Sequence, residues 1–155
     1  MEEIENYKAF CRANLIPIPC PNTMNNNGVI LDDFGFHDML HDIMVKVVSP
    51  LAKKLWSGMG EDSLDHHHGM TVEYGLDKDR KLDLHRDNAE ITINYCLGTT
   101  FKGGTVRFEG MRCLEHIDVG PREHEIFEYE NVPGMAMIHP GRHKHLAKDI
   151  ESGDR

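Results

Sequence analysis

The stretch LDLHRDNAEITINYCLG, residues 82–98, decides how the rest of the chain is interpreted. His85 and Asp87 stand two residues apart in front of an apolar, β-prone run, residues 90–97. In a strand, residues i and i+2 point to the same side, so an imidazole and a carboxylate at this spacing can reach one ion together. The stretch therefore predicts either a metal-binding pair at a strand end or two unrelated polar residues, and the rest of the chain has to decide.

A second pair with the same spacing, His116 and Asp118, serves as an internal control, because so short a motif also matches by chance. It lies in the charged stretch CLEHIDVGPREHE, residues 113–125, which lacks the alternation of a buried strand. We therefore expect His116 and Asp118 to lie in a solvated loop.

A third ligand has to come from another strand that faces the same cavity. The chain offers three late histidines, His139, His143 and His145, with room for several strands after Asp87. Two imidazoles and one carboxylate on one face of an octahedron leave three positions open, as in non-haem Fe(II) oxygenases. Arg155 follows His145 by ten residues, and an arginine on a neighbouring strand can hold an organic acid through a bidentate pair.

The first 65 residues are predicted to be mainly helical. Residues 1–16 place Ile4, Tyr7, Phe10 and Cys11 on one helical face. Residues 33–56 carry apolar side chains at helical spacing, and Pro50 should kink or split this helix. The proline- and asparagine-rich segment 16–28 between them is expected to be extended, with a short strand at 29–31.

The second part of the chain, residues 66–155, is predicted to be a β core. Apolar residues alternate in short runs separated by glycine- and proline-containing turns, at residues 70–74, 90–97, 105–108, 125–129 and 135–139. Gly103 and Gly104 are read as a tight turn or bulge, because no helix follows them. We predict one domain over 1–155, of class α+β and mainly β, with an antiparallel double sheet or jelly roll behind N-terminal helices.

The composition limits the classes of binding partner and the cellular compartment that we expect. The net charge of -9 disfavours nucleic acid and anionic membranes. The four cysteines form no CxxC pair, so we expect reduced thiols in an intracellular protein of the cytoplasm or nucleus. The N-terminus, MEEIENYKAF, lacks the basic start of a signal peptide, and no run approaches the roughly 20 apolar residues of a membrane helix.

Four ordered segments together resemble the Fe(II)- and 2-oxoglutarate-dependent dioxygenases of the prolyl 4-hydroxylase type, and within them the group of 2-oxoglutarate- and iron-dependent oxygenase domain-containing proteins. The segments are PNTMNNNGVILDD (21–33), HRDNAEITINYCLG (85–98), FKGGTVRFEG (101–110) and GMAMIHPGRHKHLAKDIESGDR (134–155). The resemblance implies a double-stranded β-helix with N-terminal helices packed on one sheet.

The resemblance also implies roles for single residues. His85, Asp87 and His145 match the iron ligands of the family. Arg155 matches the residue that pairs with the C5 carboxylate of 2-oxoglutarate, and Tyr74 matches a tyrosine that lines the co-substrate pocket. Because the sequence stops at Arg155, we expect this residue to fray, its terminal carboxylate to compete for the guanidinium, and 2-oxoglutarate to bind weakly.

The implied activity is hydroxylation of a side chain, with a protein or peptide as the expected substrate. 2-Oxoglutarate and O2 are consumed, succinate and CO2 are released, and ascorbate is the expected reductant of the iron. Two alternatives stay open. One is a catalytically weak pseudo-oxygenase that serves as a binding module, and the other is a cupin-like metalloprotein that does not use 2-oxoglutarate.

Other polar residues have plainer interpretations. The run His66-His67-His68 is expected to be a loop that leads into a strand, because adjacent residues point in different directions and cannot all bind one ion. His143 is a competing ligand, and His139 is expected to be a strand residue near the pocket. Arg86 and Asn88 flank the ligand pair and either touch substrate or lie at a solvated edge.

Overall fold

The computed structural model describes residues 1–59, 64–98 and 100–155. Residues 60–63, at the predicted boundary between the two sections, lie outside the described residues. The α-helices lie in the N-terminal section, as predicted: α1 (Glu2–Ala13), α2 (His37–Ile43) and α3 (Ser49–Leu55). Short 3₁₀ turns occupy Leu31–Phe34, Leu114–His116 and Glu123–Glu125.

The strands form antiparallel ladders. They are β1 (Gly28–Ile30), β2 (Met70–Val72), β3 (Leu82–His85), β4 (Ile91–Tyr95), β5 (Thr100–Gly103), β6 (Val106–Glu109), β7 (Ile126–Tyr129), β8 (Ala136–Pro140), β9 (His145–Ala147) and β10 (Ile150–Asp154). The largest sheet has four strands in the order β3-β9-β6-β7, and β1–β2, β4–β8 and β5–β10 form two-stranded ladders. The mainly β, α+β class is confirmed, and closure of these ladders into a jelly roll stays a prediction.

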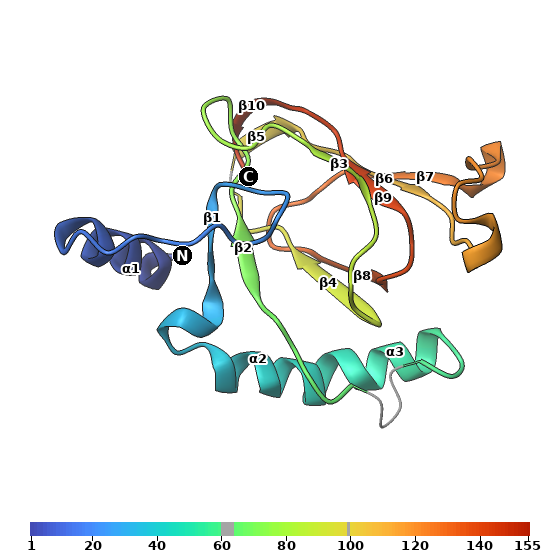
Figure 1. The fold of residues 1–155 in the computed structure, drawn as a ribbon, viewed down its shortest axis with the longest axis horizontal. Coiled ribbons are helices and arrows are strands. Elements are labelled where there is room, and N and C mark those ends of the chain that lie inside the picture. Colours follow the sequence, from blue (N-terminus) through green and yellow to red (C-terminus); the bar gives the residue numbers. More distant parts are fainter. Residues whose placement is uncertain (60–63, 99) are drawn as a thin grey trace.

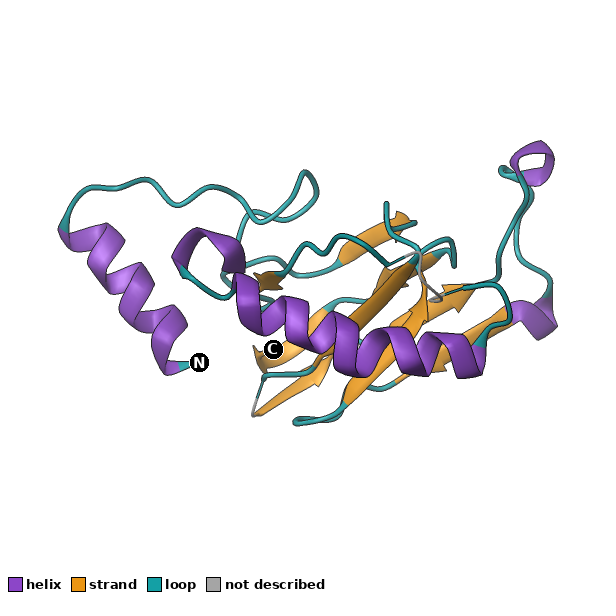
Figure 2. Cartoon of the chain, turned by 90° about the horizontal axis from the view of Figure 1, so that it is seen from below, coloured by secondary structure: helices purple, strands orange, loops and turns teal. Residues whose placement is uncertain are grey.

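The helices lie to one side of the strands. Figure 1 shows α2 and α3 running beneath the strands, with α1 beside the segment that leads to β1. Figure 2 shows the α2–α3 segment crossing one face of the strands. Ile4 and Cys11 of α1 are buried as predicted, but Phe10 is 59% exposed. Tyr7 stacks on Phe34 of the following segment, with ring centroids 4.4 Å apart.

The predicted split at Pro50 takes the form of a π-helical turn, Met44–Val48, between α2 and α3. Proline has no N–H to donate to the carbonyl four residues before it, and its ring crowds the preceding turn of the helix. The helix therefore widens at that turn. The buried face runs through Met44, Val48 and Ala52. Part of the predicted apolar stripe is exposed, with Met39 before the π-helical turn, Val47 within it, and Leu51 and Leu55 after it. The wider turn shifts the phase of the helix for the residues that follow it.

Four strands, β3, β5, β9 and β10, were not among those that the alternation of apolar residues predicted. β3 follows the charged residues 77–81, and β5 is short and ends in glycine, which weakens the periodic signal in both. Gly103 and Gly104 have φ of 80° and 67° in the predicted turn between β5 and β6. A β-carbon on Gly103 would lie 2.5 Å from the carbonyl oxygen of Asp149, so the close approach of the two chain segments requires glycine there.

A small hydrophobic core joins the sheet to β10. It contains the buried residues Tyr74, Ala147 and Ile150, with Val72, Leu82 and Phe101 packed against them. All four cysteines are free thiols, as predicted. Among the residues described, no helix has the length and apolar character that a membrane crossing requires.

Candidate metal centre

The register between β3 and β9 brings two distant histidines face to face. His85 is the last residue of β3 and His145 is the first residue of β9, and the two are directly paired. Their ring centroids lie 4.2 Å apart. The third residue, Asp87, follows β3 at once, and its N–H donates to the carbonyl of Gly141 at 2.9 Å. Three predicted ligands are thus gathered by one strand pairing and one loop contact.

The ligand atoms of these residues form a compact group. His85 Nε2 lies 3.3 Å from Asp87 Oδ1, and His145 Nε2 lies 3.8 Å from Asp87 Oδ2. One atom from each of the three residues lies within 4.8 Å of the other two. This arrangement of two imidazole nitrogens and one carboxylate can hold one metal ion.

Hydrogen bonds to the far side of each ring fix which nitrogen is free. His85 Nδ1 is 2.8 Å from the carbonyl oxygen of Asp83, and His145 Nδ1 is 2.9 Å from that of His143. A carbonyl oxygen only accepts, so each Nδ1 carries the proton and donates it. The lone pair of a neutral imidazole is then on Nε2, which faces the carboxylate.

The carboxylate is kept ionised by its neighbours. Burial raises the pKa of Asp87, but hydrogen bonds from His85 and Thr92 and the charge of His145 more than offset this and lower it to about 2. The Thr92 hydroxyl donates to Asp87 Oδ2 at 2.6 Å. In the metal-free protein, burial lowers the pKa of His85, but the protonated ring donates from Nε2 to Asp87 and from Nδ1 to the carbonyl of Asp83, and these hydrogen bonds outweigh burial and raise that pKa. Burial lowers the pKa of His145.

The two competing late histidines are placed beside this group. His139 is 4% exposed, and its Nδ1 donates to the carbonyl of Pro140 at 2.9 Å. Its Nε2 accepts from the side-chain amide of Asn94 at 3.3 Å, so its lone pair is occupied. His143 packs its ring on Phe108, with centroids 4.8 Å apart. Neither joins the compact group of ligand atoms.

The aromatic ring of Phe108 packs against the three late histidines at the centre, which the sequence did not indicate. It pairs with His145 in the β6–β9 register and also contacts His139 and His143. Thr92 and Asn94, the hydrogen-bonding supports, were missed as well. Their only sequence signal is that they lie two residues apart on one face of β4.

Gly141 controls the approach of the loops at the centre. Its N–H donates to the carbonyl of Glu90 at 3.0 Å while its own carbonyl accepts from Asp87. A β-carbon at this position would lie 2.1 Å from the carbonyl oxygen of Ala89. Only glycine lets the loop after β8 lie this close to the loop that carries the carboxylate.

The control pair lies in the loop region that was expected for it. His116 ends a 3₁₀ turn, and its Nδ1 is 3.0 Å from Cys113 Sγ. Its partner in the motif, Asp118, belongs to no compact ligand group of the described residues. Asp118 nevertheless lines a cavity at the metal centre, a contribution that the motif argument missed.

That cavity has a volume of about 540 Å³ and opens directly on two ligands. Its lining comprises Leu84, His85, Arg86, Asp87, Asn88, Ile117, Asp118, Arg142 and Lys144. Arg86 and Asn88 line this cavity and are also exposed to solvent, so both positions considered for them stay open. The Lys144 ammonium donates to the carbonyl of Ile117 and ties the loop after β6 to the segment before β9.

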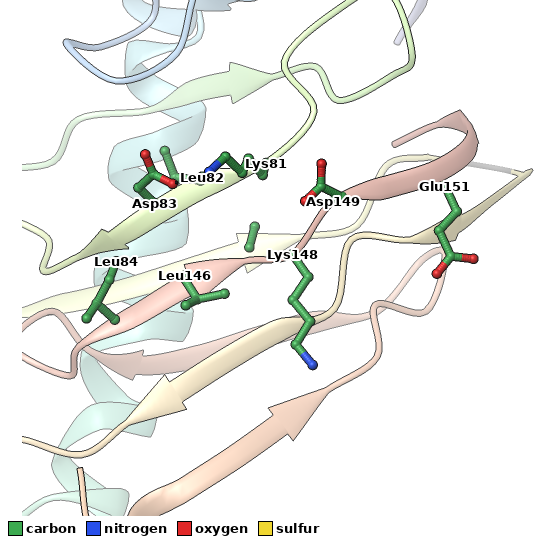
Figure 3. Close-up of a pocket in the computed structure, with 9 residues that line it drawn as sticks. Lys81, Leu82, Asp83, Leu84, Leu146, Lys148, Asp149 and Glu151 are labelled. Carbon is green, nitrogen blue, oxygen red and sulfur yellow. Dashed lines mark ion pairs between the residues drawn. The ribbon is translucent and has the colours of Figure 1, made fainter. Parts of the chain in front are cut away.

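A second hollow, of about 420 Å³, lies elsewhere on β3 and β9 (Figure 3). Leu84 and Leu146, which line it, adjoin the two ligands in sequence and so point to the other face of their strands. Its lysines are paired, Lys81 with Asp83 at 2.8 Å and Lys148 with Glu128 at 2.6 Å. Its chemistry is that of a solvated outer sheet face.

Arg155 and Tyr74 are brought together, at a different place from the cavity. The Arg155 guanidinium lies over the Tyr74 ring, with its carbon 4.3 Å from the ring centroid, and donates to the carbonyl of Gly104. Their backbones exchange two hydrogen bonds of 2.9 and 3.0 Å. The predicted fraying of Arg155 is therefore wrong, because strand pairing and the cation–π contact hold it.

Sequence comparisons identify proteins that are similar to this chain. A family model described as an OGFOD2-like domain matches residues 1–61. A protein of Arabidopsis thaliana named 2-oxoglutarate and iron-dependent oxygenase domain-containing protein ICU11 is 43% identical over the whole chain. The proteins named 2-oxoglutarate and iron-dependent oxygenase domain-containing protein 2 from Xenopus tropicalis and Homo sapiens are 38% and 32% identical, also over the whole chain.

The chain is similar over its whole length to 2-oxoglutarate and iron-dependent oxygenase domain-containing proteins. The family resemblance predicted from the sequence is confirmed.

The chain spans 39% of the Arabidopsis oxygenase domain-containing protein and 42% of the Xenopus and human ones. The match to the OGFOD2-like model covers α1, β1, α2 and α3, whereas all three candidate ligands lie beyond residue 61. The names of these relatives imply iron and 2-oxoglutarate for them, and the roles of single residues in this chain rest on its own geometry.

Proposed function

We propose that this chain contributes an Fe(II)- and 2-oxoglutarate-dependent dioxygenase centre that hydroxylates a side chain of a protein or peptide. The observation that carries the proposal is the convergence of His85, Asp87 and His145, with both imidazoles held as Nδ1–H tautomers. Two neutral imidazoles and one carboxylate are the donor set of non-haem Fe(II) oxygenases.

The residues present fit an iron ion. Each histidine Nε2 faces the carboxylate, and Thr92 and the two backbone carbonyls hold the three ligands in place. Bound iron, with 2-oxoglutarate and O2, would supply the oxidising chemistry and release succinate and CO2, with ascorbate keeping the metal reduced. The part of the chain is to hold the metal at one face and leave the other face open to ligands.

Arg155 and Tyr74 are the proposed anchor for the distal carboxylate of 2-oxoglutarate. His145 and Ala147 lie two residues apart on β9 and so share a face, and Tyr74 packs with Ala147. The step from His145 to Ala147 is about 7 Å along the strand, a length on the scale of a five-carbon dicarboxylate. A guanidinium has five N–H donors, of which the Gly104 carbonyl takes one.

The cavity of about 540 Å³ is the proposed substrate entrance. It opens on His85 and Asp87, and Arg86, Arg142 and Lys144 place three cationic groups around it. Its walls come from three separate chain segments, which suits an extended segment better than a fully enclosed small molecule. A protein or peptide side chain is therefore the substrate that we propose.

Succinate formation tests the proposal. The chain is incubated with Fe(II), ascorbate and 2-oxoglutarate, and succinate is measured beside anaerobic Fe(II) binding. His85→Ala should abolish both, and His116→Ala, the matched control in the other His-x-Asp pair, should leave both unchanged. Iron binding without succinate in the unmodified chain would favour the pseudo-oxygenase, and metal-dependent turnover without 2-oxoglutarate would favour the cupin-like alternative. Loss of iron binding in His116→Ala alone would overturn the ligand assignment.

A further inference from the structure

A second group of potential metal ligands lies in the N-terminal section, away from the elements that form the first. Asp32 is in the 3₁₀ turn after β1, His37 is the first residue of α2, and His67 is in the segment that leads into β2. One ligand atom from each lies within 4.8 Å of the other two. The group takes one member, His67, from the run of three histidines at 66–68; the His66 ring lies 6.1 Å from that of His67 and is not part of the group.

Two atoms of this group are buried and without hydrogen-bond partners. They are Asp32 Oδ1 and His67 Nδ1. His37 Nδ1 lies 3.4 Å from Asp32 Oδ1, but that contact lacks the geometry of a hydrogen bond. Buried polar atoms are nearly always bonded, and each exception costs about 1–3 kcal/mol unless an ion or water meets it. An unbonded carboxylate oxygen and an unbonded imidazole nitrogen in one cluster point to a cation between them.

The distances suit such an ion. Two ligands of a tetrahedral zinc with bonds of about 2.0–2.1 Å lie about 3.3 Å apart, close to the 3.4 Å between Asp32 and His37. The rings of His37 and His67 have centroids 4.6 Å apart. His41, one turn along α2, has its ring 6.0 Å from that of His67, within reach of a fourth position by a rotamer change.

The donors select the class of metal. Imidazole nitrogens with a single carboxylate favour zinc and related divalent transition metals, whereas calcium and magnesium take oxygen ligands. His37 is mostly exposed, with 65% of its side chain accessible, so the group is open to ions from solution. It is distinct from the first centre in both residues and elements.

We propose that Asp32, His37 and His67 bind a zinc ion that fastens the start of α2 to the segment entering β2. The backbone already joins these segments, since Leu31 N–H donates to the carbonyl of Gly69 at 2.9 Å and Ile30 pairs with Met70. The ion extends this ladder by one further link, at the point where the helical section meets the strands. Metal binding that exists only in the folded chain adds to its stability.

Zinc stoichiometry of single and double variants tests this site separately from the first one. Zinc is titrated in competition with a chromogenic chelator, because zinc also fits the histidine-carboxylate centre. The unmodified chain should bind two zinc ions, and His85→Ala and His37→Gln should each bind one. The double variant should bind none tightly. Loss of a ligand should weaken the affected site by at least about 100-fold, more than the 10–100-fold of a supporting residue.

Thermal unfolding in zinc and in chelator gives a second readout. In the His85→Ala background, zinc should raise the unfolding temperature, and His37→Gln should remove that rise. His37 is exposed, so its replacement leaves the core intact, and His66→Ala is the matched control that should keep both the zinc ion and the rise. A single zinc ion in the unmodified chain that His85→Ala removes, or equal zinc affinity in His85→Ala with and without His37→Gln, would overturn the proposal while leaving the oxygenase centre untouched.

Discussion

His145 lies directly opposite His85 in the β3–β9 ladder, with the two ring centroids 4.2 Å apart. The ladder register shifts between Leu82 and His85, so the pairing at the metal centre is reached through an irregularity in the strand. Because side chains alternate along a strand, a slip of one residue would turn His85 to the outer face. The centre therefore depends on strand register as much as on ligand identity.

Thr92 is expected to govern metal affinity without touching the metal. Thr92→Val removes the hydroxyl that donates to Asp87 at 2.6 Å and should weaken Fe(II) binding about 10–100-fold, as loss of a supporting hydrogen bond does. Anaerobic Fe(II) titration measures this. Thr92→Ser keeps a hydroxyl and should restore most of the affinity, and equal affinity in the valine and serine variants would contradict the role.

Phe108 is expected to support the centre through packing. It is 4% exposed and contacts three imidazoles, so Phe108→Ala should lower the free energy of unfolding by about 3–5 kcal/mol. Phe127, its partner in the β6–β7 register, is 60% exposed and provides the control. Chemical denaturation should show a much smaller loss for Phe127→Ala, and similar losses for the two variants would count against this packing role.

Arg155 is expected to control the affinity for 2-oxoglutarate. Arg155→Lys keeps the charge but loses the planar pair of donors, so the KM for 2-oxoglutarate should rise about 10- to 100-fold, on the order of a charge-assisted hydrogen bond. Arg80→Lys is the control, because the Arg80 side chain makes a long ion pair of 3.9 Å with Asp149 and a long hydrogen bond of 3.5 Å to the carbonyl of Ile150. Succinate kinetics at varied 2-oxoglutarate measure the change, and an unaltered KM in Arg155→Lys would remove Arg155 from the co-substrate site.

Acid should destabilise the metal-free protein through Asp87. Its pKa falls from 3.8 to about 2 on folding, so this carboxylate contributes stability above pH 4 and loses it as the pH falls from about 4 to 2. The shift corresponds to about 2 kcal/mol. Urea unfolding at pH 5, 3 and 2 should show this loss, and Asp87→Asn should show correspondingly less. An equal fall in the free energy of unfolding between pH 5 and pH 2 in both proteins would assign the effect to other groups.

The sequence predicted the candidate ligands better than their surroundings. The spacing of His85 and Asp87 indicated a pair that reaches one point, because alternation along a strand is a local property. The choice of His145 over His139 and His143 needed the family resemblance, since all three were compatible with the spacing. In the structure the difference is physical, because Asn94 occupies the lone pair of His139, and such a cross-strand contact has no local sequence signal.

Most helices and several strands were also predictable, but their details were not. Pro50 predicted an interruption of the helix. The form of that interruption, a π-helical turn with Met44, Val48 and Ala52 on the buried face, depends on how the backbone relaxes around the proline. β3, which carries His85, was hidden by charged residues before it and by its four-residue length. The run at 66–68 was correctly expected to be a loop, but its approach to Asp32 and His37 is a long-range contact.

Gly141 carries only a hydrogen atom where any other residue has a side chain, and the two loops at the metal centre lie close together for that reason. Even a methyl group at this position would clash with the backbone of Ala89. The loop that carries Asp87 would then be displaced from the two imidazoles. All three ligands would still be present in such a chain, yet they would no longer meet. An intact ligand motif is thus a poor guide to activity in this fold unless the empty space beside it is intact as well.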